Sequence, residues 1–145
     1  MNIETYTKNY CCFFENNNKN TPYDNYRFFF DESSIFQDPF QKVIGVEKIY
    51  DVFQDMYKTL YSAKFNIKSF STNDSQSFIE WEFVYKMKNN SKQSSFTGVS
   101  IVKFNNDAKI VSHIDYWDAA SNIYEKIPLL GSILKIIRKK ISLNE

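Results

Sequence analysis

The amino-acid sequence predicts a protein of the α+β class. Residues 3–60 carry apolar side chains at helical spacing, whereas residues 65–117 carry them at every second position, as strands do. Because the helical segments come first and the strands follow with no helix between them, an antiparallel sheet is expected instead of alternating βαβ units. The 145 residues fit a single domain, 1–145, in which residues 126–145 form a C-terminal extension.

Two helices are expected first. Residues 3–14 show helical spacing of apolar side chains, and the polar run 16–20 ends the pattern. Thr21 is expected to cap the second helix with its hydroxyl, and Pro22 suits the first helical position because its missing N–H is not needed there. This second helix should run to about Phe29.

A brief strand and a long helix follow. Ile35 and Phe36 predict a strand that ends at Asp38-Pro39, because proline donates no hydrogen bond to a sheet. A loop then leads to Gly45. From Val46 to Leu60 the apolar positions keep an unbroken i, i+3, i+4, i+7 series, which predicts the long helix.

Four strands are expected next, because alternation of apolar and polar residues replaces the helical period. They cover residues 65–70, 79–85, 99–104 and 110–117. Turn-forming residues separate them at 72–75, 88–91 and 105–107. Strands joined by such short turns form an antiparallel meander.

The C-terminal extension is amphipathic and basic. Residues 126–145 carry a net charge of +4, and residues 1–125 sum to −3. One helical face is apolar: Leu130, Ile133, Leu134, Ile137 and Ile141. Such a helix packs on the body of the protein or on a partner subunit, or it lies on an anionic membrane surface. Single-stranded nucleic acid is a weaker alternative, because no aromatic residues alternate with the basic ones.

The composition supplies a core and excludes several functions. With 43% hydrophobic and 18% aromatic residues, the chain can bury enough apolar surface to fold, which excludes a disordered protein. Lys and Arg number 18 against 17 Asp and Glu, so the overall positive field that attracts nucleic acid is absent and no nucleic-acid partner is expected.

No metal and no cofactor are expected. Cys11 and Cys12 are adjacent, which disfavours a disulfide, and His113 is the only histidine, so one chain cannot assemble a zinc site of four nitrogen or sulfur ligands. The three glycines lie too far apart for a dinucleotide or phosphate loop. A polar start and the lack of an 18-residue apolar run favour a cytoplasmic location.

Two segments resemble the nuclear transport factor 2-like superfamily, in its SnoaL-like and ketosteroid-isomerase-like branch. They are Phe36–Phe40 (FQDPF), followed by Gly45 and the long helix, and Ile110–Asp118 (IVSHIDYWD). The resemblance covers about residues 3–120. It implies a cone in which a curved sheet wraps around the long helix, with a pocket between the sheet and the N-terminal helices. It also implies a homodimer that pairs through the sheets.

The same resemblance places Asp38 where the isomerases hold their general base. A carboxylate that faces an apolar cavity has a raised pKa, which suits a base. Ser100 falls where the isomerases have a protonated acid, and Phe14 falls near their tyrosine donor. Because Phe14 has no hydroxyl, steroid isomerisation is not the expected reaction. Tyr10 and Tyr26 are further candidate donors, and helical phase does not tell which one points inward.

Alternation along the last strand places His113, Asp115 and Trp117 on one face, which the family's geometry makes the pocket side. A His–Asp pair two residues apart can share a hydrogen bond that fixes the imidazole tautomer. With Asp38, the pair can form an acid/base group. The alternative is a buried pair that only holds the sheet together.

The sequence therefore predicts a cone that binds a small, largely apolar molecule. The candidate ligand-binding residues are Phe14, Tyr26, Phe36, Trp81, Phe83, Ser100, Val102 and Trp117. If the protein is an enzyme, we expect an isomerisation, cyclisation or hydration without a cofactor, with Asp38 as base and His113 or Asp115 as proton donor. The alternative is a non-catalytic binding or interaction module, associated with a membrane surface through its C-terminal helix.

Overall fold

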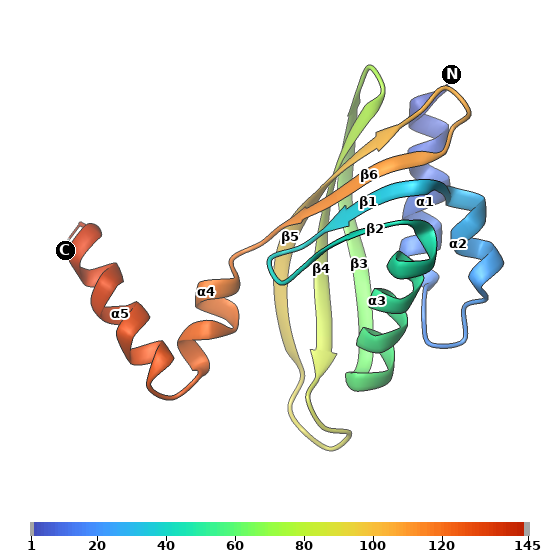
Figure 1. Ribbon diagram of the computed structural model, residues 1–145. Coiled ribbons are helices and arrows are strands. Elements are labelled where there is room, and N and C mark those ends of the chain that lie inside the picture. The colour runs from blue at the N-terminus through green and yellow to red at the C-terminus, as the bar shows by residue number, and fades with distance from the viewer. Residues whose placement is uncertain (1, 144–145) are drawn as a thin grey trace.

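The computed structural model describes residues 2–143 and confirms the α+β prediction (Figure 1). Six strands form one sheet in the order β2-β1-β6-β5-β4-β3. The strands are β1 (Phe30–Gln37), β2 (Lys42–Ile44), β3 (Tyr61–Asn73), β4 (Gln76–Lys86), β5 (Ser94–Phe104) and β6 (Ile110–Tyr116). The helices are α1 (Ile3–Asn16), α2 (Tyr23–Phe29), α3 (Val46–Thr59), α4 (Ala119–Asn122), the 3-10 turn η1 (Tyr124–Lys126) and α5 (Leu130–Ile141).

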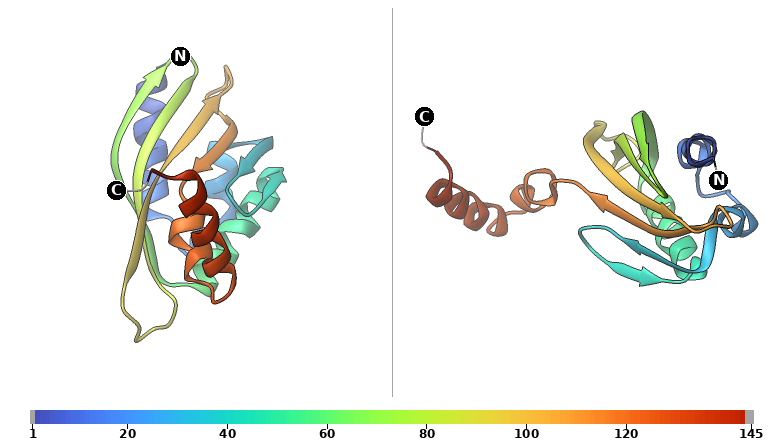
Figure 2. Two further views of the ribbon diagram at one scale, coloured as in Figure 1. Left: turned by 90° about the vertical axis from the view of Figure 1, so that its left-hand side faces the viewer. Right: turned by 90° about the horizontal axis from the view of Figure 1, so that it is seen from above.

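The sheet curves around α1, α2 and α3, and α5 lies apart from it (Figures 1 and 2). Strands β3 to β6 form the expected antiparallel meander. Strand β1 joins it by parallel pairing with β6, in which Phe36 pairs with His113 and Gln37 with Ile114. This register places the end of β1 beside the end of β6.

Helix α1 begins where its N-cap is satisfied. The side chain of Asn2 accepts a hydrogen bond from the backbone N–H of Thr5 at 3.1 Å. Tyr10 and Phe14 lie on the face of α1 that is buried against the sheet. The amphipathic pattern therefore identifies the buried face correctly.

The expected cap of α2 is wrong. Thr21 Oγ1 accepts from the backbone N–H of Asn18 at 2.9 Å, and Pro22 takes the N-cap position with no side-chain cap. The hydroxyl thus closes the loop between the two helices, where Thr21 N–H also donates to the Asn18 carbonyl at 3.1 Å.

The first part of the sheet is larger than expected. Strand β1 starts at Phe30, directly after α2, and residues 42–44, expected as loop, form β2 and pair with β1. Gly45 has φ +106°, a conformation that favours glycine, and its N–H donates to the Ser34 carbonyl at 2.8 Å. This turn starts α3 at the edge of the β1–β2 hairpin.

The core fills the end of the cone under α1 and α2. It consists largely of aromatic side chains in tilted and edge-to-face contacts; for example, the ring of Phe14 lies 4.4 Å from Phe65, and that of Phe13 lies 5.2 Å from Tyr26. Closely packed rings therefore occupy this end of the cone.

The outer face of the sheet stays open to solvent. Val99 and Tyr116 pair across β5 and β6 and are both exposed. The homodimer through the sheet stays a prediction, for which this apolar pair on the outer face is available.

The C-terminal extension does not pack on the cone. Among the described elements, α5 has its extensive contact with η1 alone, so packing of its apolar face on the body is wrong for the single chain. No helix within residues 2–143 is long and apolar enough to cross a membrane.

Candidate functional site

A cavity of about 600 Å³ lies between the concave face of the sheet and α3. Its lining comes from the β1–β2 hairpin, α3, strands β3 to β6 and the segment after β6. Neither α1 nor α2 contributes a lining residue, so the expected pocket against the N-terminal helices is wrong. Aromatic side chains of α1 and α2 occupy that space, and the hollow opens farther along the cone.

The cavity wall is mostly aromatic and aliphatic. Phe96 and Trp117 stack with ring centroids 4.1 Å apart and an interplanar angle of 19°. The exposed ring of Phe40 lies 5.4 Å from Trp117. Helix α3 and the residue after it add apolar side chains that were not expected at the site: Val52, Phe53, Met56 and Leu60. Such a wall suits an apolar ligand.

Gly98 on β5 makes room for one wall of the cavity. A Cβ atom at this position would lie 2.5 Å from Cη2 of Trp81 and 3.0 Å from Cβ of Trp117. The absence of a side chain therefore lets the Trp81 indole lie flat against β5. A lone glycine within a strand pattern, which often marks a close approach, was the available signal.

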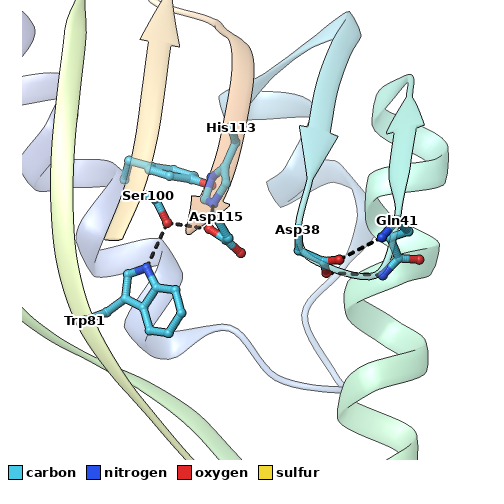
Figure 3. Close-up of polar contacts among 7 residues, drawn as sticks. Asp38, Gln41, Trp81, Ser100, His113 and Asp115 are labelled. Atoms are coloured by element: carbon cyan, nitrogen blue, oxygen red, sulfur yellow. Dashed lines mark hydrogen bonds and ion pairs between the residues drawn. The ribbon is translucent and has the colours of Figure 1, made fainter. Parts of the chain in front are cut away.

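A chain of hydrogen bonds runs behind the cavity wall (Figure 3). The indole Nε1 of Trp81 donates to Ser100 Oγ at 2.8 Å, and Ser100 Oγ donates to Asp115 Oδ1 at 2.5 Å. His113 Nε2 lies 2.7 Å from the same Oδ1, and His113 Nδ1 lies 2.7 Å from the Tyr10 hydroxyl oxygen. These side chains connect α1 to three strands of the sheet.

Burial sets the direction of the protons in this chain. Desolvation, followed by the nearby charge of Asp115, raises the pKa of Tyr10 well above its usual value, so the phenol keeps its proton. Its O–H then donates to His113 Nδ1. The imidazole proton resides on Nε2 and is donated to Asp115 Oδ1.

The two carboxyl oxygens of Asp115 consequently differ in their hydrogen bonds. Oδ1 accepts from both Ser100 and His113, whereas no side chain or amide within residues 2–143 forms a hydrogen bond with Oδ2. Asp115 lines the cavity and is 8% exposed. A proton carried by this carboxyl would reside on Oδ2, because the acceptor positions of Oδ1 are occupied.

Asp38 also lines the cavity and at the same time holds the turn between β1 and β2. Its Oδ1 accepts from the backbone N–H groups of Phe40 at 2.8 Å and Gln41 at 3.0 Å. Its Oδ2 has one longer bond, 3.3 Å, from Gln41 Nε2. Burial raises the pKa of Asp38; the hydrogen bonds partly oppose the increase, and the charge of Asp115 adds to it.

The sheet brings the two carboxyls together. Because Gln37 pairs with Ile114, the next residues along both strands, Asp38 and Asp115, follow at neighbouring positions. Both line the main cavity and a second, more open hollow beside it. Each presents Oδ2 as its less occupied oxygen, so the pair can accept and deliver protons at one end of an apolar space.

The other predicted residues fall into two groups. Phe36, Trp81, Phe83 and Trp117 line the cavity with the two aspartates. His113, Ser100, Val102, Phe14 and Tyr26 are buried and line no part of it. His113 and Ser100 lie behind Asp115 and hold its Oδ1. Tyr26 donates to Asn17 Oδ1 at 2.8 Å, so Tyr10 is the helical tyrosine that reaches the site.

Besides the two aspartates, the buried Tyr85 lines the cavity, and the charged side chains of α3 lie at its rim. Lys48, Asp51 and Asp55 of α3 are exposed at its edge. Within residues 2–143, no three His, Cys, Asp or Glu side chains are grouped so that they could hold a metal ion. Burial raises the pKa of Cys11 to about 12, so this thiol stays protonated.

The sequence matches the model of one protein family, that of the SnoaL-like domain, over residues 14–113. No protein with a curated function matches the chain. Residues 14–113 include α3, most of the sheet and Asp38.

Solved structures share the fold at low identity. An NTF2-like protein of unknown function from Exiguobacterium sp. 255-15 is 16% identical with a TM-score of 0.66, over 78% of this chain and 98% of that one. A protein provisionally assigned as a SnoaL-like polyketide cyclase from Jannaschia sp. CCS1 is 7% identical with a TM-score of 0.71, over 81% and 88%. An LEH-like epoxide hydrolase from M. tuberculosis is 10% identical with a TM-score of 0.66, over 97% and 95%.

Proposed function

Since the chain belongs to the SnoaL-like domain family, we propose that its cone binds a small, largely apolar molecule and acts on it by acid/base chemistry. One observation carries the proposal: two carboxyls, Asp38 and Asp115, each present a less occupied oxygen at the end of an otherwise apolar cavity. Carboxyls in such surroundings are suited to move protons.

The size and lining of the cavity support a small apolar ligand. About 600 Å³ lies within the range of roughly 300–1,000 Å³ that is usual for small-molecule sites. The inner wall consists of aromatic rings, and the exposed polar residues of α3 stand at the rim. A bound ligand would therefore contact aromatic rings instead of water, and it would meet polar atoms chiefly at the two aspartates.

Asp38 is the proposed base. Its raised pKa brings it closer to neutral pH than an ordinary aspartate, which favours proton transfer from a weakly acidic C–H or from water. The proton would be taken by Oδ2, because the two backbone amides of the turn occupy Oδ1. The turn thus fixes which oxygen reacts.

Asp115 is the proposed proton donor. The carboxylate of Asp115 would first receive a proton on Oδ2 from Asp38, its neighbour in the cavity wall, and would then give it to the oxygen or carbon of the substrate that gains electron density. In an isomerisation, the proton that Asp38 takes from the substrate thus returns to the substrate through the pair, so no net proton is consumed. His113, Ser100 and Tyr10 act as positioning residues, because they reach Asp115 and not the cavity.

The reaction types that fit are isomerisation, cyclisation and hydration. All three need a base and a proton donor close to the reacting atoms of the substrate and no redox cofactor. Among proteins with this fold, one is described as a polyketide cyclase and another as an epoxide hydrolase. Those descriptions belong to those proteins, and they agree with proton transfer inside a cone.

Proton exchange in a bound ligand tests the proposal. Small ketones that displace the neutral apolar probe N-phenyl-1-naphthylamine are incubated with the protein in deuterated water, and loss of the α-hydrogen signal is followed by NMR. The wild-type protein should accelerate the exchange. Asp38→Asn should reduce this acceleration by about 10²–10⁴-fold while binding of the probe persists.

The matched control is Asp107→Asn, the same change at an exposed position between β5 and β6 that does not line the cavity, which should leave both exchange and binding unchanged. Met56→Trp, which places a large side chain in the cavity, should abolish binding of the probe. Equal exchange in wild type and Asp38→Asn would contradict the assignment of the base.

A second candidate function is ligand binding without catalysis. The observation that favours it is the bonding of Asp38, whose carboxylate caps the amides of its own turn as a purely structural aspartate would. In that case wild-type protein binds the probe and the ketones, but no bound ketone exchanges its α-hydrogens faster than in buffer.

A further inference from the structure

Helix α5 carries a surface that the cone does not use. Four side chains of its apolar face are exposed, namely Leu130, Ile133, Ile137 and Ile141, and only Leu134 on the same face is half-buried. Ile137 in the middle of the helix is 50% exposed, and Ile141 near its end is 83% exposed. A face of this kind normally lies against another apolar surface.

The contacts that hold α5 in place come from another side of the helix. A Cβ atom at Gly131 would lie 2.1 Å from the Glu125 carbonyl oxygen, so the backbones of α5 and η1 are in close contact there. Arg138 forms an ion pair with Glu125 and donates to Ser121 Oγ at 2.6 Å. Gly131 and Arg138 are seven residues apart, two helical turns, and share one flank, which leaves the apolar face free.

The charges of α5 indicate which kind of surface covers its apolar face. Between Leu130 and Ile141 there are four basic residues and no acidic one. Arg138 is engaged by Glu125, whereas Lys135, Lys139 and Lys140 are exposed and form no ion pair within residues 2–143. A second copy of α5 would offer apolar side chains but no negative charge for these lysines, because the helix carries no acidic residue. An anionic lipid surface offers an apolar layer and negative charges together.

We propose that α5 docks the protein on an anionic lipid bilayer, with its isoleucines among the acyl chains and its lysines at the headgroups. The helix would lie in the plane of the surface. This proposal does not depend on catalysis in the cone.

The position of the helix connects this surface to the cavity. Ile123, which follows α4 and leads into η1, lines the cavity, and the ring of Tyr124 lies 6.0 Å from that of Phe40 at the mouth. When the protein is docked through α5, the residues of the extension that lie beside the mouth of the cavity would be close to the bilayer. Apolar molecules are concentrated in the bilayer.

Sedimentation with vesicles tests the proposal on the full chain. Vesicles of phosphatidylcholine alone are compared with vesicles of equal parts phosphatidylcholine and phosphatidylglycerol. Wild-type protein should bind only the anionic vesicles, and less at high salt because the lysines are screened. The triple variant Lys135→Gln, Lys139→Gln, Lys140→Gln should lower the partition coefficient on the order of a hundredfold, at roughly fivefold per lysine.

A matched control removes three exposed lysines from the cone: Lys58→Gln, Lys68→Gln and Lys88→Gln. The net charge of this control variant equals that of the helix variant. It should keep binding the anionic vesicles if the site is α5, and an equal loss of binding in both variants would mean that only the overall charge matters. Ile133→Ser with Ile137→Ser tests the apolar face and should also lower the partition coefficient, with the melting temperature unchanged because neither side chain is in the core.

Two results would overturn the proposal. One is equal sedimentation of the wild type with neutral and anionic vesicles. The other is a wild-type dimer, seen by analytical ultracentrifugation without lipid, that Ile133→Ser with Ile137→Ser converts to a monomer. The second result would identify another copy of this chain as the occupant of the α5 face.

Discussion

Helices α3 and α5 have the same kind of sequence and opposite surroundings. Both carry one apolar face and one charged face. The apolar face of α3 packs against the sheet, with Ile49 fully buried and Phe53 3% exposed. Helix α5 lies apart from the sheet (Figure 2), and Leu130, Ile133, Ile137 and Ile141 on its apolar face are exposed. Amphipathic spacing therefore predicts that a face will be covered, and it does not say by what.

The difference arises from the residues next to each helix. Gly45 turns α3 back toward the hairpin that precedes it, and β3 follows directly after α3, so the helix lies against its own sheet. Helix α5 follows β6 through α4 and η1 and has no strand after it. Its contact with η1 holds it through Gly131 and Arg138. If this contrast is correct, the effect of a substitution should decrease with the exposure of the side chain.

The largest effect is expected in α3. Phe53→Ala removes a ring that lies 5.2 Å from Phe36 and 5.8 Å from Phe14, and the neighbours can collapse only partly into the space. The free energy of unfolding should fall by about 3–5 kcal/mol, measured by urea denaturation. A loss under 1 kcal/mol would show that α3 is no better covered than α5.

A buried polar contact should give the next largest effect. Tyr10→Phe removes the hydroxyl that donates to His113 Nδ1, which is then left buried without its donor. The free energy of unfolding should fall by about 1–3 kcal/mol. The NMR shifts of the His113 ring should change as well, whereas the control Tyr61→Phe, at an exposed position, should change neither quantity.

Asp38, which is half-buried, should give a smaller effect that depends on pH. Burial raises its pKa in the folded chain above that in the unfolded chain, so the stability from its protonated form is complete at acidic pH and is lost as pH rises through the folded pKa. Asp38→Asn does not ionise, so its melting temperature relative to wild type should increase with pH. The corresponding gain in the free energy of unfolding should stay below about 1 kcal/mol, because solvent screens the exposed part of the carboxyl.

The smallest effect is expected in α5. Ile137→Ala removes a side chain that is 50% exposed and makes no core contact, so the free energy of unfolding should change by less than about 0.5 kcal/mol. The same urea denaturation, compared with Phe53→Ala, checks the prediction. A loss above 2 kcal/mol would mean that the face is covered in solution.

Much of the fold was predictable because the long helices and strands show a clear periodic pattern of apolar residues. The i, i+3, i+4, i+7 series of α3 and the alternation in β4 identified both elements nearly to their ends. Strand β2 was missed because a segment of three residues has no period and becomes a strand only through pairing with β1. The start of β1 was missed because Asp31 and Glu32 resemble turn residues, and here they lie in the strand.

The candidate site was predictable where it depends on strand alternation. The two-residue period places Asp115 inward beside His113, and the structure shows both turned to the concave side. The rotation of α1, which selects Tyr10 over Tyr26 as the partner of His113, depends on how α1 packs on the sheet. The α3 side chains of the cavity wall were missed for the same reason, because helix position is a tertiary property.

The parallel register of β1 and β6 has a consequence for redesign. Position 115 is fixed by its place in β6, and position 38 follows Gln37, the last paired residue of β1, which lies beside Ile114. A new pair of residues installed at positions 38 and 115 would need a side chain at position 38 that also accepts from the turn amides of Phe40 and Gln41, as Asp38 does. One inserted residue in β6 would turn position 115 to the outer surface and dismantle the arrangement.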